Sequence, residues 1–154
     1  MRIDVVAYDH PDAVKLIAEV QQEYVDRYGS SDPSPVDPAE FAPPRGLFLV
    51  GYTDGGAVAC GGWRADADGA GAEIKRMYVA PAARRAGLAR AMLAELERTA
   101  LAAGHRKVIL ETGGRLPEAL ALYRSAGYAP VTPFGYFASA PTSIHLGKQL
   151  DTGP

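Results

Sequence analysis

A short apolar strand that leads through a basic turn directly into a helix is the feature that most constrains how this chain folds. Residues 74–79 read IKRMYV, residues 84–89 read RRAGLA, and apolar residues recur at helical spacing from Leu88 to Ala103. The first N–H groups of a helix have no partner within the helix and lie at the positive end of its dipole. A turn that exposes them suits a phosphate or a pyrophosphate, so the sequence predicts an anion-binding turn.

The side chains of this turn fit the same interpretation. Gly87 and Ala89 add little bulk, and glycine can adopt a positive φ where a ligand approaches the backbone, while Arg84 and Arg85 add positive charge. Short motifs of this kind often occur by chance, so an ordinary turn with solvated arginines is the alternative. A nucleotide-binding P-loop is disfavoured, because the chain lacks the pattern Gly-x-x-x-x-Gly-Lys-Ser/Thr and shows no carboxylate set for Mg²⁺.

Composition limits the class of protein and the kind of ligand. The chain has 154 residues, of which 47% are hydrophobic and 22% charged, as expected for one globular domain. A net charge of −2 makes the basic turn a local patch, which favours a small anion and argues against nucleic acid. Cys60 is the single cysteine and the three histidines are scattered, so we expect neither a disulfide nor a metal site. Without a signal-like N-terminus or a long apolar run, we expect a cytoplasmic protein and no membrane contact.

The first half of the chain predicts a strand, a helix, a long loop and an antiparallel meander. Alternating residues 3–8 predict the strand, and Asp9 and Pro11 are start signals for a helix that extends to about Arg27. The loop, residues 30–44, holds five prolines and allows a short helix near residues 38–41. The meander strands, which glycine- and aspartate-rich turns connect, are residues 47–53, 57–64 and 72–80.

The second half predicts a right-handed crossover. Residues 107–112 form the strand that follows the helix after the basic turn, so this strand should lie parallel to residues 74–79. The remaining expected elements are a helix that opens at Pro117, a loop at residues 130–141 and a closing strand at residues 142–150. We expect residues 1–150 to form a single domain and residues 151–154 a flexible tail.

Four motifs in this order resemble the GNAT superfamily of acetyl-CoA-dependent N-acetyltransferases. They are residues 73–79 (EIKRMYV), 84–89 (RRAGLA), 110–113 (LETG) and 119–128 (ALALYRSAGY). The resemblance covers nearly the whole chain. It implies an α/β (α+β) fold with three α-β-α layers, whose mixed, mostly antiparallel sheet of about six to seven strands splays at the acetyl-CoA site.

The resemblance assigns the basic turn to coenzyme A. In the family, main-chain amides bind the pyrophosphate, and pantetheine inserts between two splayed strands like an added strand. Leu116 is a departure, because many relatives carry Asn or Gln there to help hold the cofactor arm. The implied cofactor-binding residues are Met77, Tyr78, Val79, Arg84, Arg85, Ala86, Gly87, Leu88, Ala89, Arg90, Leu116 and Tyr123.

Acetyl transfer to an amine needs an uncharged nucleophile, a polarised thioester carbonyl and a proton donor for the departing thiolate. The resemblance implies that Tyr123 is the general acid and that the Val79 N–H polarises the carbonyl. Glu73 is the candidate general base, because some relatives hold a catalytic glutamate there, and Glu111 is the second candidate. A water chain to bulk solvent could replace either carboxylate. The alternatives are a core tyrosine at position 123 and an exposed acid at position 73.

The acceptor is the part that the sequence determines least. Its candidate binding residues are Tyr24, Tyr28, Arg64, Glu111 and Tyr136, of which Arg64 suits an acceptor carboxylate. The expected reaction moves acetyl from acetyl-CoA to a primary amine of a small-molecule or peptide-like acceptor, by direct attack in a ternary complex. A module that binds acyl-CoA without catalysis is the alternative. A homodimer is one expected assembly, since similar proteins are commonly dimers.

Overall fold

Seven strands form one sheet in the computed structural model, which describes residues 1–150. The strands are β1 (Arg2–Val6), β2 (Gly46–Thr53), β3 (Gly56–Ala65), β4 (Ala72–Val79), β5 (Lys107–Gly113), β6 (Ala129–Pro130) and β7 (Ser143–Gln149), in the order β1-β2-β3-β4-β5-β7-β6. Neighbouring strands are antiparallel except for β4 and β5, which are parallel. The predicted tail, residues 151–154, lies outside the described residues.

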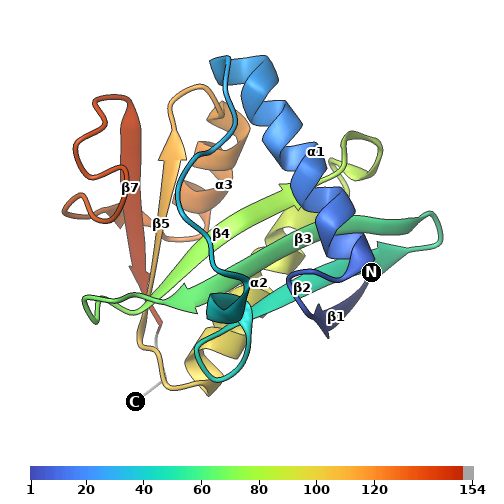
Figure 1. The fold of residues 1–154 in the computed structure, drawn as a ribbon, viewed down its shortest axis with the longest axis horizontal. Helices are drawn as coiled ribbons and strands as arrows, with labels where there is room; N and C mark the ends of the chain where they lie inside the picture. Colours follow the sequence, from blue (N-terminus) through green and yellow to red (C-terminus); the bar gives the residue numbers. More distant parts are fainter. Residues whose placement is uncertain (151–154) are drawn as a thin grey trace.

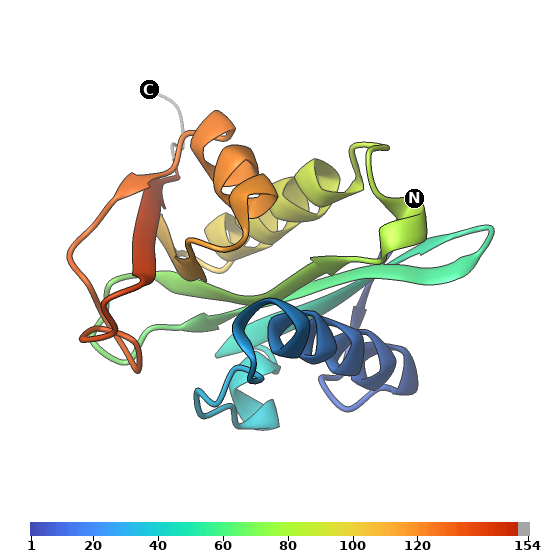
Figure 2. The same cartoon turned by 90° about the horizontal axis from the view of Figure 1, so that it is seen from above.

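The helices cover both faces of this sheet. They are α1 (Pro11–Tyr28), α2 (Leu88–Ala102) and α3 (Pro117–Ser125), with short 3₁₀ helices at Pro38–Phe41 and Pro81–Ala83. Helix α1 packs on one face, and α2 and α3 pack on the other (Figures 1 and 2). The predicted three-layer fold with a mixed, mostly antiparallel sheet is therefore confirmed.

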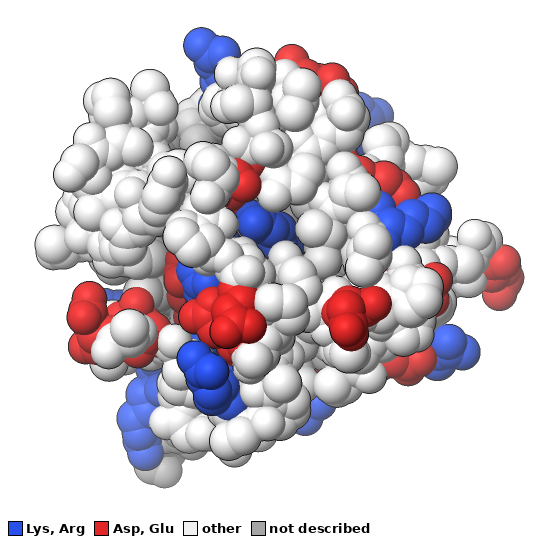
Figure 3. Space-filling model, viewed as in Figure 1, with Lys and Arg blue, Asp and Glu red and all other residues white. Residues whose placement is uncertain are grey.

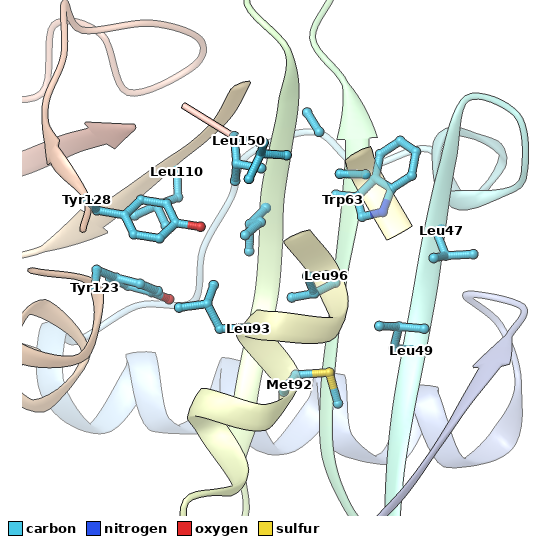
Figure 4. Close-up of a cluster of buried hydrophobic side chains, with 14 of the residues drawn as sticks. Leu47, Leu49, Trp63, Met92, Leu93, Leu96, Leu110, Tyr123, Tyr128 and Leu150 are labelled. Atoms are coloured by element: carbon cyan, nitrogen blue, oxygen red, sulfur yellow. The ribbon is translucent and has the colours of Figure 1, made fainter. Parts of the chain in front are cut away.

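Each face of the sheet has its own hydrophobic core, because each helix buries one apolar stripe. On the α1 face, Leu16 and Val20 pack against Phe48. On the other face, the α2 residues Met92, Leu93 and Leu96 pack between the strands and Tyr123 and Tyr128 (Figure 4). The helix after the basic turn is thus held by a continuous core, which fixes the turn itself.

Three local predictions differ from the structure. Strand β1 ends at Val6 instead of Tyr8. His10 caps α1 instead of Asp9, because a turn from Ala7 to His10 places the His10 ring where its Nδ1 accepts the Asp12 N–H at 3.1 Å. The short strand β6 pairs with β7 at the edge of the sheet, where the sequence predicted the start of a loop.

Strands β4 and β5 separate soon after they begin. Their recorded pairs are Ala72 with Val108 and Glu73 with Ile109. Beyond these pairs β4 contains a bulge, in which Arg76 and Met77 lie opposite the single residue Gly61 of β3. Arg76 has a φ of 60°, a conformation that costs a non-glycine residue about 1–3 kcal/mol. The two strands are therefore splayed on the carboxyl side of the sheet.

Candidate active site

A cleft of about 890 Å³ lies where β4 and β5 diverge. Its walls come from the second half of α1, β4, the basic turn, β5, α3 and the loop before β7. Eleven of the twelve predicted cofactor residues line it: Met77, Tyr78, Val79, Arg84, Arg85, Gly87, Leu88, Ala89, Arg90, Leu116 and Tyr123. Ala86 is the predicted residue outside the lining. The structure therefore gathers the strand, the basic turn and α3 around one cavity.

The basic turn presents the first turn of α2 to this cleft. Gly87 caps the helix with a φ of 77°, and among the described residues the structure shows no side-chain capping bond at this helix start. A Cβ at Gly87 would meet nothing within 4 Å, so glycine is favoured there by its backbone conformation and not by crowding. Helix-start amides without side-chain partners suit an anionic group of a ligand.

Arg84 is held in place by hydrogen bonds and is not a freely mobile charge. Its Nε donates to the Val79 carbonyl at 2.9 Å, and its Nη2 donates to both oxygens of Glu23 at 3.1 and 3.2 Å. Glu23 also lies 3.5 Å from Arg27, which pairs with Glu118 at the start of α3. An ion-pair chain thus connects the basic turn to α3, and so joins the two sides of the cleft.

In this ion-pair chain, Glu23 neutralises the charge of Arg84, which the sequence predicts to bind a phosphate. We expect Glu23→Gln to tighten coenzyme A binding by about three- to fivefold, since partly exposed pairs contribute about 0.2–1 kcal/mol each. Isothermal titration calorimetry at low and high salt measures this effect, which should shrink at high salt. Asp26→Asn is the matched control, because it removes one negative charge from the same helix, and Asp26 accepts from Gln22 outside the cleft lining. Equal affinities for the two variants would contradict this role of Glu23.

Tyr123 lies on α3 with its side chain almost fully buried. Its ring lies 5.7 Å from that of Tyr128, and the two rings are side by side in Figure 4. Burial raises the pKa of Tyr123 to about 12. The Tyr128 hydroxyl donates to Glu97 at 2.8 Å and does not line the cleft. Tyr123 is therefore a protonated phenol at neutral pH that lines the same cavity as the basic turn.

The two candidate bases have different surroundings. Glu111 lines the cleft, and burial raises the pKa of its carboxyl to about 7. The positive charge of Lys75 acts in the opposite direction and lowers this pKa, but its effect is smaller. The Ser143 hydroxyl donates to Glu111 at 3.3 Å. Glu73 lies outside the lining, and its carboxylate accepts from Arg64 Nε at 3.1 Å. The arrangement therefore favours Glu111 as the group that accepts a proton.

Arg64 also lies outside the cleft. Its guanidinium donates to Glu40 at 3.1 Å and to the Pro35 carbonyl at 3.0 Å, in addition to Glu73. Only 14% of its side chain is exposed. These bonds tie the proline-rich loop to the sheet, so the contacts of Arg64 are structural and leave its guanidinium away from the cavity.

Aromatic residues of α1 form one wall of the cleft. Tyr24 and Tyr28 line it, and burial raises the pKa of Tyr24 above its ordinary value. A Cβ at Gly113, the last residue of β5, would approach the Tyr28 hydroxyl to 2.0 Å, so a larger residue there would displace the Tyr28 ring. Tyr136 is 61% exposed and outside the lining, whereas its neighbour Phe137 lines the cleft. The predicted aromatic loop therefore contributes a different residue from the one expected.

The charged residues of the lining that were not predicted from the sequence are Glu23, Asp32, Lys75, Arg76 and Glu118. Asp32 Oδ2 accepts from Arg76 Nη1 at 2.6 Å and lies 3.4 Å from Lys75 Nζ. Burial by itself would raise the pKa of Asp32, but Lys75, Ser34 and Arg76 together hold it below its ordinary value. Asp32 lies in a proline-rich loop without periodicity, and no sequence signal marked Arg76 as a bulge residue.

The described part of the chain contains no group of three or more His, Cys, Asp or Glu residues that could hold a metal ion. Within residues 1–150, no helix is both long and apolar enough to cross a membrane. On the face drawn in Figure 3, basic and acidic side chains are interspersed, without a broad area of one sign.

Comparisons with known proteins agree with this geometry. The profile of the Acetyltransferase (GNAT) family matches residues 17–128. A protein of Azospirillum brasilense named IAA acetyltransferase is 36% identical over 137 residues, which cover 89% of this chain and 90% of that protein. A structure described as an acyl-CoA N-acyltransferase from Klebsiella pneumoniae is 28% identical, with a TM-score of 0.78 over 97% of both chains. The N-acetylglutamate synthase of Neisseria gonorrhoeae, solved with coenzyme A and N-acetyl-glutamate, has a TM-score of 0.72 at 17% identity and matches 98% of this chain but 36% of that one.

Proposed function

Because the chain belongs to the GNAT family of acetyltransferases, we propose that it transfers the acetyl group of acetyl-CoA directly to the primary amine of a small acceptor. The observation that carries this proposal is that one cleft is lined by the anion-binding turn, by the buried phenol of Tyr123 and by the carboxyl of Glu111. A donor held at the turn and an acceptor held near Glu111 would occupy the same cavity. Such a ternary complex needs no covalent enzyme intermediate.

The donor is proposed to lie along β4. Its pyrophosphate would bind the amides of residues 85–90, and its pantetheine arm would follow the open edge of the strand. Ala80 N–H donates to the Val58 carbonyl at 2.8 Å, so the N–H of the preceding residue, Val79, points away from β3 and toward the opened side. This direction supports the Val79 amide as the donor that polarises the thioester carbonyl.

The proposed reaction removes one proton from the attacking nitrogen and delivers one to the departing sulfur. The amine nitrogen attacks the acetyl carbon, and the tetrahedral intermediate collapses as the carbon–sulfur bond breaks. Glu111 takes the proton that the nitrogen loses, and Tyr123 gives its proton to the thiolate sulfur. Cys60 does not compete as an acyl carrier, because it is fully buried and burial raises the pKa of its thiol.

The acceptor end of the cleft supports a compact molecule. Tyr24, Tyr28 and Phe137 provide apolar walls, while Glu111 and Ser143 provide polar groups. A cavity of this kind orients a small molecule through few polar contacts. The relative named IAA acetyltransferase also supports a small-molecule acceptor.

A broad acceptor screen tests the proposal. Purified protein is incubated with acetyl-CoA and with amino acids, polyamines, aminoglycosides, arylalkyl amines and short peptides, while released thiol is recorded and products are identified by mass spectrometry. We expect at least one amine to gain the mass of an acetyl group in place of one hydrogen atom, with an equal amount of free thiol. Tight acetyl-CoA binding in calorimetry without turnover of any amine would contradict the proposal and favour an acyl-CoA-binding module.

A further inference from the structure

Arg76 is a charged residue with a strained backbone and a buried side chain. Its φ is 60°, and only 4% of its side chain is exposed, although it lies in the middle of β4. Residues with a Cβ rarely adopt this conformation, and it persists only where the surrounding structure enforces it. The acetyl-transfer steps described above give its guanidinium no role, so the conformation needs another explanation.

The strained residue creates the β4 bulge. The cross-strand pairs on either side are Gly62 with Lys75 and Cys60 with Tyr78, so β4 has one more residue than β3 between them. The bulge also shifts the alternation of side chains. Ile74 and Met77, three positions apart, both pack against the α2 core. The segment that follows the bulge is the one that lines the cleft.

Asp32 draws the two neighbours at the bulge to the same face of the sheet. Lys75 and Arg76 are adjacent in sequence, and adjacent residues of a regular strand point to opposite faces. Both nevertheless reach one oxygen of Asp32, with Arg76 Nη1 at 2.6 Å and Lys75 Nζ at 3.4 Å. This shared contact is compatible with the bulged strand and not with a regular one.

Asp32 is itself fixed in position. Its N–H donates to Gln21 Oε1 at 2.8 Å, and Gln21 Nε2 donates to its carbonyl at 3.2 Å, which anchors the loop to α1. Its Oδ1 accepts the Ser34 N–H at 2.8 Å. The Ser34 hydroxyl in turn accepts from Lys75 Nζ at 2.6 Å. The carboxylate is therefore a rigid point between α1 and β4.

We propose that Asp32 is a positioning residue for acetyl transfer, which acts by pairing with Lys75 and Arg76 to hold the bulge that aims the backbone of residues 77–79 into the cleft. This inference rests on the proposed function, because it assigns the Val79 amide to the donor. It makes a specific claim about position 76. The positive φ matters there, and the guanidinium matters only as the means by which Asp32 enforces it.

Two variants at one position separate these roles. Arg76→Ala and Arg76→Gly both remove the guanidinium, but only glycine adopts the positive φ readily. We expect Arg76→Ala to lower kcat by about a hundredfold, as small misplacements at an active site do. Arg76→Ala should also weaken coenzyme A binding about tenfold. For Arg76→Gly, both kcat and the Kd for coenzyme A should stay within about threefold of the wild-type values. Asp32→Asn should resemble Arg76→Ala, and the double variant Asp32→Asn/Arg76→Gly should recover the values of Arg76→Gly. Asp68→Asn, in an exposed turn, is the control for loss of one carboxylate.

The variants test the role of Asp32 through kcat when an acceptor is known and through coenzyme A affinity when it is not. Equal losses in Arg76→Gly and Arg76→Ala would overturn it, as would a rise confined to the acceptor KM, which would place the guanidinium on the acceptor. Thermal unfolding confirms that the compared variants are folded. Coenzyme A affinity needs no acceptor, so its order among the variants tests the bulge separately. Absence of turnover in the wild type would instead overturn the proposed function.

Discussion

Replacing Tyr123 with phenylalanine is expected to lower kcat for acetyl transfer by about a hundredfold, within the range typical for loss of a general acid. The ring remains, so its packing against Tyr128 and the α2 core is kept. Burial raises the pKa of Tyr123 to about 12, which means that the hydroxyl still carries its proton when the thiolate departs. The Kd for coenzyme A should change by less than about twofold, since the phenol acts on the sulfur and not on the phosphates.

Tyr128→Phe is the matched control for this variant. It removes the same atom from the adjacent ring, but the Tyr128 hydroxyl is bonded to Glu97 at 2.8 Å and lies outside the cleft lining. It should therefore reduce the free energy of unfolding by about 1 kcal/mol and leave kcat unchanged. Equal turnover in Tyr123→Phe and the wild type would remove Tyr123 from the mechanism.

Replacing Glu111 with glutamine is expected to have the second large effect, on kcat/KM and its dependence on pH. Because burial raises the pKa of Glu111 to about 7, kcat/KM of the wild type should rise with pH through about 7 as the carboxyl loses its proton. Glutamine accepts no proton, so this rise should disappear and kcat/KM at pH 8 should fall by about a hundredfold. Any rise at the pKa of the amine itself should remain in both proteins. Stopped-flow or plate-reader thiol release from pH 5.5 to 9 measures the profiles.

Glu73→Gln is the control, because Glu73 is the other glutamate near the start of the splayed strands. Its carboxylate pairs with Arg64 outside the cleft, so this variant should lose stability and keep the pH profile. The stability of Glu111→Gln gives a second readout. The folded pKa of Glu111 lies above its ordinary value of 4.5, so the wild type should lose stability relative to the variant as pH rises from 4.5 to about 7. If the rise of kcat/KM near pH 7 disappeared in Glu73→Gln and remained in Glu111→Gln, the general base would be Glu73 and not Glu111.

The sequence predicted the fold well because the relevant signals are local. The glycine-rich turns predicted the meander, and the strand, basic turn and helix predicted the crossover that places β5 parallel to β4. The cap of α1 and the end of β1 differ from the predictions by one and two residues. His10 replaces Asp9 as the cap of α1 because the turn that precedes the helix orients its ring, and sequence spacing does not encode that orientation.

The acceptor side could not be predicted in the same way, because long-range pairing decides which side chains face the cavity. Glu73 lies directly opposite Arg64 in the β3–β4 register, and this pairing keeps both out of the cleft. Glu111 faces the cavity because β5 diverges from β4 after Ile109. Asp32 contacts Lys75 and Arg76, which are more than forty positions away in the sequence, and no local pattern reveals such a contact.

The proposed acetyl transfer is tested most directly by measuring both products of one reaction. Wild-type protein and Tyr123→Phe are each supplied with acetyl-CoA and the best acceptor from the screen, and free thiol and N-acetylated amine are quantified together over time. We expect equal amounts of the two products from the wild type, and about hundredfold slower formation of both by the variant at an unchanged Kd for coenzyme A. Thiol release that does not depend on the acceptor, beside tight binding of coenzyme A, would contradict the proposed acetyl transfer.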